Sequence, residues 1–332
     1  MHNWNRREVT AAALALLAPT LTLPARAQTG PRGGITKVYC GFPPGDSADL
    51  VARIYIDKMR PSFPQGLIVE NRAGAGGRTA LDLLRREPAD GNSFILTPSS
   101  MLTLAPHAVK GVPYDALKDF APISRACINP FALSVGPMVP PSVQTLEQFL
   151  SWCKVNPMLA NYGTAGVGTT MHLLGANFAR LAKVNLNMVP YRGGGPAATD
   201  LVGGQVASVM STLPGVMEFA RAGKVRILAV SSEARWPTLP DVPTFAESGY
   251  RDLTFIQWFG FVAPAGTPEA ALERINAQVR QASRMPEVIK ALDSLGLEAA
   301  TSATPAEFAK DVRAEHERWR RIVQAIGFKA EG

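Results

Sequence analysis

Short apolar runs rich in β-branched residues alternate with longer helix-like stretches along most of this 332-residue chain. Runs of this kind, bounded by Gly and Pro, are typical of buried strands, and the stretches between them have the spacing of amphipathic helices. Alternating strands and helices favour an α/β fold, because each helix carries the chain back to the start of a neighbouring strand. We therefore expect mainly parallel sheets, with strands at residues 35–40, 67–70, 93–97, 131–135, 225–231 and 259–263.

Several helix starts can be placed from their capping residues. Thr145 stands three residues before Gln148, which is the spacing of a capping box. Thr267 and Thr304 each precede a proline, a residue favoured at the first position of a helix. Apolar residues after Thr304 keep helical spacing almost to the end of the chain, so the sequence predicts a long closing helix.

Two proline-rich joints, at residues 127–141 and 235–243, are candidate domain boundaries. The length of the chain also suggests two domains rather than one. If the chain crosses between domains at both joints, lobe 1 is discontinuous and comprises residues 30–128 plus 236–332, and lobe 2 comprises residues 129–235. Two crossings would form a hinge with a cleft between the lobes, a common location for ligands.

Residues 1–27 have the layout of a secretory signal peptide that is cleaved from the mature protein. A charged start at Arg6-Arg7 precedes a mostly apolar stretch, and Ala25-Arg26-Ala27 has the small-x-small pattern of a cleavage site. The alternative, a membrane anchor, is disfavoured because Pro19 interrupts an apolar stretch already short for a bilayer. We expect a periplasmic protein; the paired arginines are compatible with the twin-arginine route, and the general secretory route stays open as the alternative.

Composition and charge are those of an ordinary globular protein, with 46% hydrophobic and 18% charged residues. The formal net charge of +7 falls to +5 once residues 1–27 are removed. Lys and Arg are scattered, without a basic run interleaved with aromatic residues, so we expect no nucleic-acid partner. No stretch after residue 27 is long and apolar enough to span a membrane.

Three cysteines, Cys40, Cys127 and Cys153, allow at most one internal disulfide and leave one thiol over. The favoured alternative is that they are buried thiols packing as small hydrophobic groups, since Cys40 and Cys127 lie in apolar surroundings. No spacing of Cys and His suggests a zinc site, so no metal is expected.

The segment GFPPGDSAD at residues 41–49 joins the first strand-like run to a helix. Its consecutive prolines stiffen a turn whose backbone N–H groups face outward, and such a turn suits an anion. The same segment carries two carboxylates, Asp46 and Asp49. At a helix start, two acids are more often capping residues than an acid/base pair.

Three further glycine-rich loops follow. The loop at 71–79 lacks the ending of a phosphate loop and the spacing of a dinucleotide fingerprint, so close backbone packing is preferred to nucleotide binding. The loop at 162–172 places three threonines at a helix start, where they either bind a carboxylate or simply cap the helix. In the loop at 189–196, Arg192 could pair with a carboxylate or remain solvated.

Residues suited to catalysis are sparse. His107, His172 and His316 stand in unrelated contexts, and there is no Gly-x-Ser-x-Gly elbow. We therefore expect no enzymatic activity. Two rival hypotheses remain: a secreted hydrolase, whose turnover His172→Ala would abolish, and a structural protein, which would show no thermal shift with any small molecule.

Seven short motifs run through the chain: GFPPG with Asp49 at 41–49, VENRAGAGG at 69–77, PYD followed by KDFAP at 113–122, YGTAGVGTTMHL at 162–173, VPYRG at 189–193, LPDVPT at 239–244 and APAGTP at 263–268. Their order and spacing closely resemble the Bug family, the extracytoplasmic binding proteins of tripartite tricarboxylate transporters. The resemblance covers essentially the whole mature chain.

This resemblance implies an α/β fold like that of type II periplasmic binding proteins, with two lobes joined by a hinge and a ligand cleft between them. It implies a solute-binding protein that captures a small organic acid for a membrane permease or a sensor. Family ligands are mostly carboxylates, held largely by backbone amides and ordered waters. We expect a monomer without a cofactor.

Carried over by matching position, the ligand loops would be residues 42–49, 163–172 and 191–193, with 211–214 as a further wall. The ligand-binding residues that the resemblance implies are Phe42, Pro43, Pro44, Gly45, Asp46, Ser47, Asp49, Gly163, Thr164, Ala165, Gly166, Gly168, Thr169, Thr170, His172, Tyr191, Arg192, Gly193, Ser211 and Thr212.

The chain also departs from the family pattern. Gly45-Asp46 stands where the family usually has Gly-Gly, and a carboxylate at the mouth of the cleft would oppose a bound anion by roughly 1 kcal/mol. Ser211 and Asn177 stand where the family often has Asp and Glu. A neutral or amine-bearing ligand is therefore the alternative. Asp46→Gly should strengthen the binding of an anion and weaken that of a ligand with a donor or a positive group.

Overall fold

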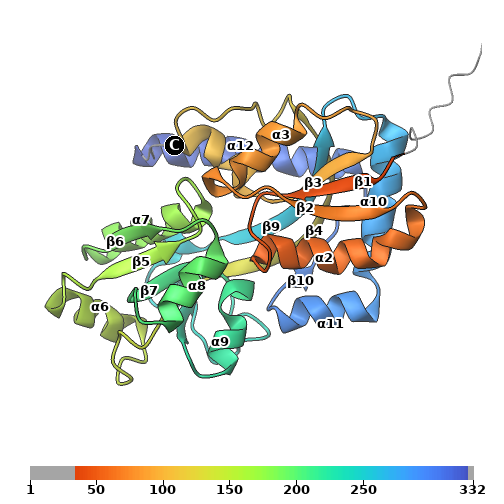
Figure 1. Cartoon of the computed structure of the whole chain (residues 1–332). Coiled ribbons are helices and arrows are strands. Elements are labelled where there is room, and N and C mark those ends of the chain that lie inside the picture. The colour runs from red at the N-terminus through yellow and green to blue at the C-terminus, as the bar shows by residue number, and fades with distance from the viewer. Residues whose placement is uncertain (1–33, 328–332) are drawn as a thin grey trace, which may run out of the picture. The chain divides into compact units, whose positions relative to one another are not determined.

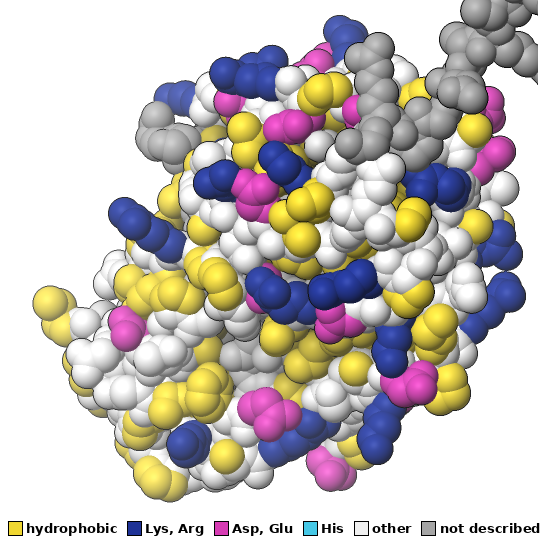
Figure 2. All heavy atoms as spheres, turned by 45° about the vertical axis from the view of Figure 1, so that its right-hand side comes forward, with side chains coloured by type: hydrophobic (Ala, Val, Ile, Leu, Met, Phe, Trp, Pro, Cys, Tyr) yellow, Lys and Arg dark blue, Asp and Glu magenta, His cyan; other side chains and the backbone are white. Residues whose placement is uncertain are grey.

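The computed structural model describes residues 34–327, which all belong to one compact unit. The predicted signal peptide, residues 1–27, lies outside the described residues. Across residues 34–327 no helix has the length and apolar character needed to cross a membrane. On the face seen in Figure 2, basic and acidic side chains are interspersed, which follows from the scattered charges of the sequence.

The strands form one mixed sheet system. Their bounds are β1 Thr36–Cys40, β2 Leu67–Asn71, β3 Ser93–Pro98, β4 Phe120–Val135, β5 Asn161–Thr164, β6 Asn187–Pro190, β7 Ser208–Thr212, β8 Arg226–Val230, β9 Ile256–Pro264 and β10 Glu298–Ala299. The order is β2-β1-β3-β9-β4-β7-β5-β6 (Figure 1). In addition, β8 and β10 pair with β4.

Only part of this sheet system is parallel. β1 runs parallel to β2 and β3, and β5 runs parallel to β6 and β7. β9 is antiparallel to β3 and β4, and β4 is antiparallel to β7, β8 and β10. The expectation of mainly parallel sheets is therefore wrong. β4 and β9 carry the chain between the lobes as extended strands, without the crossover helix that parallel neighbours need.

Strand β4 joins the two lobes. It pairs with β9 as far as Pro130, and from Phe131 onward with β7 and β8. Lobe 1 thus contains β1–β3, β9, β10 and the first part of β4. Lobe 2 contains β5–β8 and the second part of β4. The proline joint predicted near residue 130 lies inside a strand, at the point where the strand changes partners. The limits predicted for the lobes, 30–128 plus 236–332 and 129–235, stay predictions.

Helices cover both faces of each lobe (Figure 1). In lobe 1, α2, α10 and α11 contribute to one apolar cluster and α3, α4, α5 and α12 to another; in lobe 2 the pairs α6/α7 and α8/α9 do the same. The helices are α2 Ser47–Met59, α3 Arg78–Leu84, α4 Ser100–Thr103, α5 Ala105–Ala108, α6 Leu146–Val155, α7 Thr170–Ala182, α8 Gly194–Val202, α9 Met217–Arg221, α10 Glu269–Ser283, α11 Pro286–Ser294 and α12 Pro305–Ile326, with short 3₁₀ turns η1 Arg60–Ser62, η2 Ala75–Gly77, η3 Leu213–Gly215 and η4 Arg251–Leu253.

Burial of both sheet faces explains the apolar strand runs of the sequence. Successive side chains of a strand point to opposite faces. In β1, Val38 and Cys40 join the cluster beneath α2, and Tyr39 joins the cluster beneath α3 and α12. All three side chains are almost fully buried, so neither face of this strand is available for polar residues.

The predicted helix starts are largely confirmed. Thr145 and Gln148 form a complete capping box at α6, and the Thr304 hydroxyl accepts a hydrogen bond from the Glu307 amide at α12. The third start is wrong by one residue, because Pro268 is the capping position of α10 rather than its first residue. The Thr267 hydroxyl instead donates to the Pro264 carbonyl oxygen at 2.7 Å.

All three cysteines are buried free thiols, which confirms the favoured alternative for them. Burial raises the pKa of Cys40 and of Cys153 to about 12, so both thiols stay protonated at neutral pH.

The closing helix α12 packs against both lobes. Phe308 and Val312 lie in an apolar cluster of lobe 1, whereas Trp319 and Val323 lie in the main cluster of lobe 2. The Trp319 ring lies 4.9 Å from the Phe255 ring, between centroids. This helix therefore ties the lobes together next to strand β4.

We expect Trp319→Ala to lower the free energy of unfolding by about 3–5 kcal/mol, because the change removes a buried aromatic ring at this junction. Urea denaturation of the purified protein measures the loss. The control is Arg318→Ala on the exposed side of α12, expected to change stability by less than about 0.5 kcal/mol. Equal effects of the two substitutions would contradict this role of α12.

Candidate functional site

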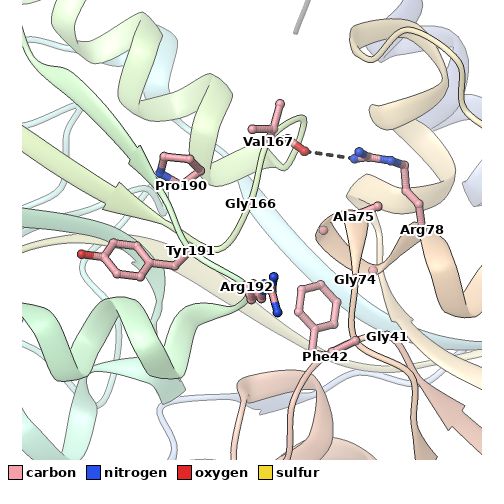
Figure 3. Close-up of a pocket in the computed structure, with 13 residues that line it drawn as sticks. Gly41, Phe42, Gly74, Ala75, Arg78, Gly166, Val167, Pro190, Tyr191 and Arg192 are labelled. Atoms are coloured by element: carbon pink, nitrogen blue, oxygen red, sulfur yellow. Dashed lines mark hydrogen bonds between the residues drawn. The ribbon is translucent and has the colours of Figure 1, made fainter. Parts of the chain in front are cut away.

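A pocket of about 420 Å³ lies between the two lobes (Figure 3). Lobe 1 contributes Gly41, Phe42 and the loop at 73–78, and lobe 2 contributes Gly166, Val167 and the segment 190–192. Pockets that bind small molecules commonly occur between two such bodies, because each supplies loops that the other covers. This pocket is the candidate site.

The loop between β1 and α2 is held in place by Asp49. Its carboxylate accepts hydrogen bonds from the Gly45 amide at 2.9 Å, from Asn71 Nδ2 at 2.8 Å and from Arg53 Nε at 2.9 Å. Burial raises the pKa of Asp49, but the bonds from Arg53, Asn71 and Gly45 outweigh it and leave the pKa below its ordinary value. Asp49 does not line the interlobe pocket; it fixes the loop whose residue Phe42 lines the cavity.

Asp46 joins the starts of two helices in different lobes. Its Oδ1 accepts from the Ala48 amide at 3.2 Å, which caps α2, and its Oδ2 accepts from the Gly194 amide at 2.6 Å, at the start of α8. Burial raises the pKa of Asp46, although the amides of Gly194, Ala48 and Gly195 act in the opposite direction. The side chain is thus buried between the lobes.

The position expected for Asp46, at the mouth of the cleft, is therefore wrong. A carboxylate is drawn to the positive end of a helix dipole, and Asp46 lies against two such ends at once. Its residue is only 7% exposed.

Close packing explains the glycine-rich loop at 73–77, as expected. Gly77 has φ of 104°, and a Cβ there would lie 2.9 Å from the Phe42 ring. Across the lobe boundary, a Cβ on Gly166 would lie 3.1 Å from the Gly76 Cα. Glycine at these places lets the backbones of the two lobes approach each other and brings the loop into the pocket wall.

Arg78, the first residue of α3, is a buried cation in this wall. It is 5% exposed, and its Nη1 donates to the Val167 carbonyl oxygen of lobe 2 at 3.0 Å (Figure 3). Burial lowers its pKa. Among residues 34–327, no carboxylate forms an ion pair with Arg78, and Val167 is its only hydrogen-bond partner. A guanidinium has five N–H donors, so most of its capacity is unused.

Arg192 and Tyr191 border the same pocket in different ways. Arg192 is exposed and forms no ion pair within the described part of the chain; in Figure 3 its side chain lies beside Phe42. Tyr191 points away from the pocket and donates its hydroxyl to Asp200 Oδ2 at 2.8 Å. Arg192 is therefore the residue of this pair that is free to contact a ligand.

A second, much smaller cavity of about 20 Å³ shares Phe42 with the first. The hydroxyls of Ser47 and Thr212, which line it from different lobes, are hydrogen-bonded at 2.7 Å. Its other lining residues are Asp46, Ala48, Pro98, Ala165, Met171, Gly194, Gln257 and Phe259. We call this cavity the polar chamber.

The two cavities bring together eight of the residues carried over from the resemblance: Phe42, Asp46, Ser47, Ala165, Gly166, Tyr191, Arg192 and Thr212. The remaining ones line neither cavity: Pro43, Pro44, Gly45, Asp49, Gly163, Thr164, Gly168, Thr169, Thr170, His172, Gly193 and Ser211. Whether any of these residues contacts a ligand stays a prediction.

Thr169 and His172 form hydrogen bonds within the loop at 162–172. Thr169 caps α7 by accepting from the His172 amide at 3.3 Å, and it donates to the Gly166 carbonyl oxygen at 2.9 Å. His172 Nδ1 accepts from the Gly168 amide at 3.2 Å. These bonds fix the shape of the loop that carries Gly166 and Val167 into the pocket.

Sequence reasoning missed Arg78 and Gln257, and each had left a signal. Arg78 opens a helix, where a cation is unfavourable unless something compensates for it. Gln257 interrupts an otherwise apolar strand. Residues 34–327 contain no group of His, Cys, Asp or Glu side chains arranged to hold a metal ion.

Comparison with known proteins places the fold and the pocket in context. The family profile described as "Tripartite tricarboxylate transporter family receptor" matches residues 51–328. Protein BugT of Bordetella pertussis is 33% identical over 310 residues, which span 93% of this chain and 94% of BugT.

Three solved structures are similar over most of the chain. Periplasmic binding protein BugD matches with a TM-score of 0.84 at 29% identity, over 91% of this chain and 100% of BugD. Rpa4515 of R. palustris, solved with adipate, gives 0.84 at 28% identity, over 90% and 98% of the two chains. MatC of Rhodopseudomonas palustris, with bound malate, gives 0.81 at 29% identity, over 87% and 98%.

The motifs, the two-lobed fold and these likenesses lead to one conclusion. The chain belongs to the TctC family of tripartite tricarboxylate transporter receptors, the family of periplasmic binding proteins that its sequence motifs predicted.

Proposed function

We propose that this chain captures a small organic acid in the interlobe pocket and passes it to a membrane permease of the tripartite tricarboxylate type or to a sensor. The observation that carries this proposal is the buried guanidinium of Arg78, which faces the pocket without a carboxylate partner. A buried charge is costly unless it is paired, so this wall favours an anion.

A carboxylate suits Arg78 better than other anions of similar size. The planar guanidinium can donate two parallel hydrogen bonds to the two oxygens of a carboxylate. Arg192 at the edge of the same pocket adds a second positive charge. The loop at 73–77 forms a further part of the pocket wall. A pocket of about 420 Å³ has room for a small acid, since ligand pockets commonly measure about 300–1,000 Å³.

Two similar proteins support a carboxylate ligand. Rpa4515 was solved with adipate and MatC with malate, and both are dicarboxylates. Their identities to this chain, 28% and 29%, leave room for a different acid here.

We also propose export to the periplasm, with residues 1–27 as the cleaved signal, by either the twin-arginine route, with which Arg6-Arg7 is compatible, or the general secretory route. The periplasmic binding proteins of the family support this location. They support a binding role without catalysis as well, and we propose that the mature chain acts as a monomer.

Calorimetric titration of the mature protein against small carboxylates, amines and uncharged solutes tests the proposal. We expect at least one carboxylate to bind. At a free concentration of a hundred times its dissociation constant it should stabilise the fold by about 2.7 kcal/mol, measurable as a shift of the urea midpoint. Binding of amines or uncharged solutes alone would contradict the carboxylate assignment and leave the binding role standing.

Arg78→Gln should weaken the binding of that carboxylate about ten- to hundredfold, because charge-assisted hydrogen bonds are lost from a buried site. Titration of the variant measures the effect. Arg72→Gln is the matched control, since Arg72 lies just before the same loop but is exposed and paired with Glu70. If both variants bind like the parent protein, Arg78 is not the anion contact.

A further inference from the structure

The polar chamber has an unused hydrogen-bond acceptor in its wall. Gln257 is 1% exposed, and its Oε1 has no hydrogen-bond partner within the described chain. On the neighbouring strand, Asn129 stands opposite Gln257 in register, and its Oδ1 also lacks a partner. Buried polar atoms are nearly always hydrogen-bonded in native proteins, so an unpaired amide oxygen on a residue that lines a cavity indicates a missing donor.

Asp46 adds negative charge to the same chamber. Its two oxygens already accept the amides of Ala48 and Gly194, so the start of α8 is occupied by the carboxylate of the protein itself. A ligand carboxylate placed there would meet Asp46 and an acceptor of Gln257 rather than free amides. A donor group would instead meet two acceptors.

The chamber also limits the size of its occupant. A volume of about 20 Å³ holds one water-sized group, since a single water needs about 10–15 Å³. A hydroxyl or an ammonium group fits this space, and a carboxylate does not. Phe42 lines both cavities, so the chamber adjoins the larger pocket at this ring.

We propose that the polar chamber receives a hydroxyl or amino group of the bound acid, so that the ligand is a hydroxy acid or an amino acid rather than an unsubstituted acid. This inference rests on the proposed function. Gln257 selects the substituent by accepting its hydrogen bond, Asp46 favours it further when it is positively charged, and Arg78 holds the acid group in the larger pocket.

A matched series of four-carbon probes tests the inference by calorimetry on the dialysed mature protein. Succinate has no substituent, methylsuccinate has a methyl group, malate a hydroxyl and aspartate an ammonium; succinamide has donors but no carboxylate. We expect malate or aspartate to bind at least tenfold more tightly than methylsuccinate. The methyl group has a similar size but leaves the Gln257 oxygen unpaired.

Gln257→Leu should reduce this preference to less than about twofold, because the acceptor is gone. If the first variant does not fold, Gln257→Glu replaces it in the test, because it keeps the size of the side chain. This variant should bind aspartate more tightly than malate. Asp46→Asn should weaken aspartate more than malate. Gln205→Leu, at an exposed position of lobe 2, is the control and should leave all affinities unchanged.

The outcomes separate the two proposals. Equal affinities for succinate, methylsuccinate, malate and aspartate would overturn the inference and indicate that the chamber holds only water. The proposed binding of organic acids would stand. Binding of succinamide alone would overturn the organic-acid function and support donor selection. Absence of binding by every probe would overturn both.

Discussion

The antiparallel pairing of β4 with β9 is the interaction on which the rest of this structure depends. These strands cross between the lobes, so the same ladder of hydrogen bonds that completes the sheet of lobe 1 also fixes where lobe 2 begins. It places Gln257 beside the polar chamber, and it brings loops that lie far apart in the sequence to opposite sides of one cavity. The site therefore depends on a pairing between residues about 130 positions apart.

The two cavities differ in electrostatic character although they share Phe42. The larger pocket presents two guanidinium groups, of which Arg78 has lost most of its contact with water. The polar chamber presents a carboxylate and an unpaired amide oxygen. Such a separation of charge orients a ligand whose two ends differ. In the reversed orientation, like charges of ligand and protein would face each other, and the groups at both ends of the ligand would lack partners. The Phe42 ring lines both cavities, so the two environments adjoin each other.

Local signals made much of the fold predictable, and long-range pairing accounts for what was missed. The strand at Thr36–Cys40 and the caps at Thr145 and Thr304 depend on neighbouring residues, so the sequence indicates them directly. The antiparallel crossing and the burial of Asp46 depend on contacts between lobes. Arg78 illustrates the limit for the site: its sequence position indicates an unfavourable charge at a helix start, but only the fold shows that it faces a pocket.

The contacts between the lobes are of a kind that can break and reform. Arg78 with Val167, Ser47 with Thr212 and Asp46 with Gly194 each form a hydrogen bond across the cleft. Water can replace every one of these partners when the lobes separate, so each bond contributes only about 0.5–3 kcal/mol, the charged ones most. A ligand that pairs with Arg78 and Gln257 adds contacts available only when both walls are near. If the ligand binds as proposed, its binding energy favours the closed arrangement of the lobes over the open one.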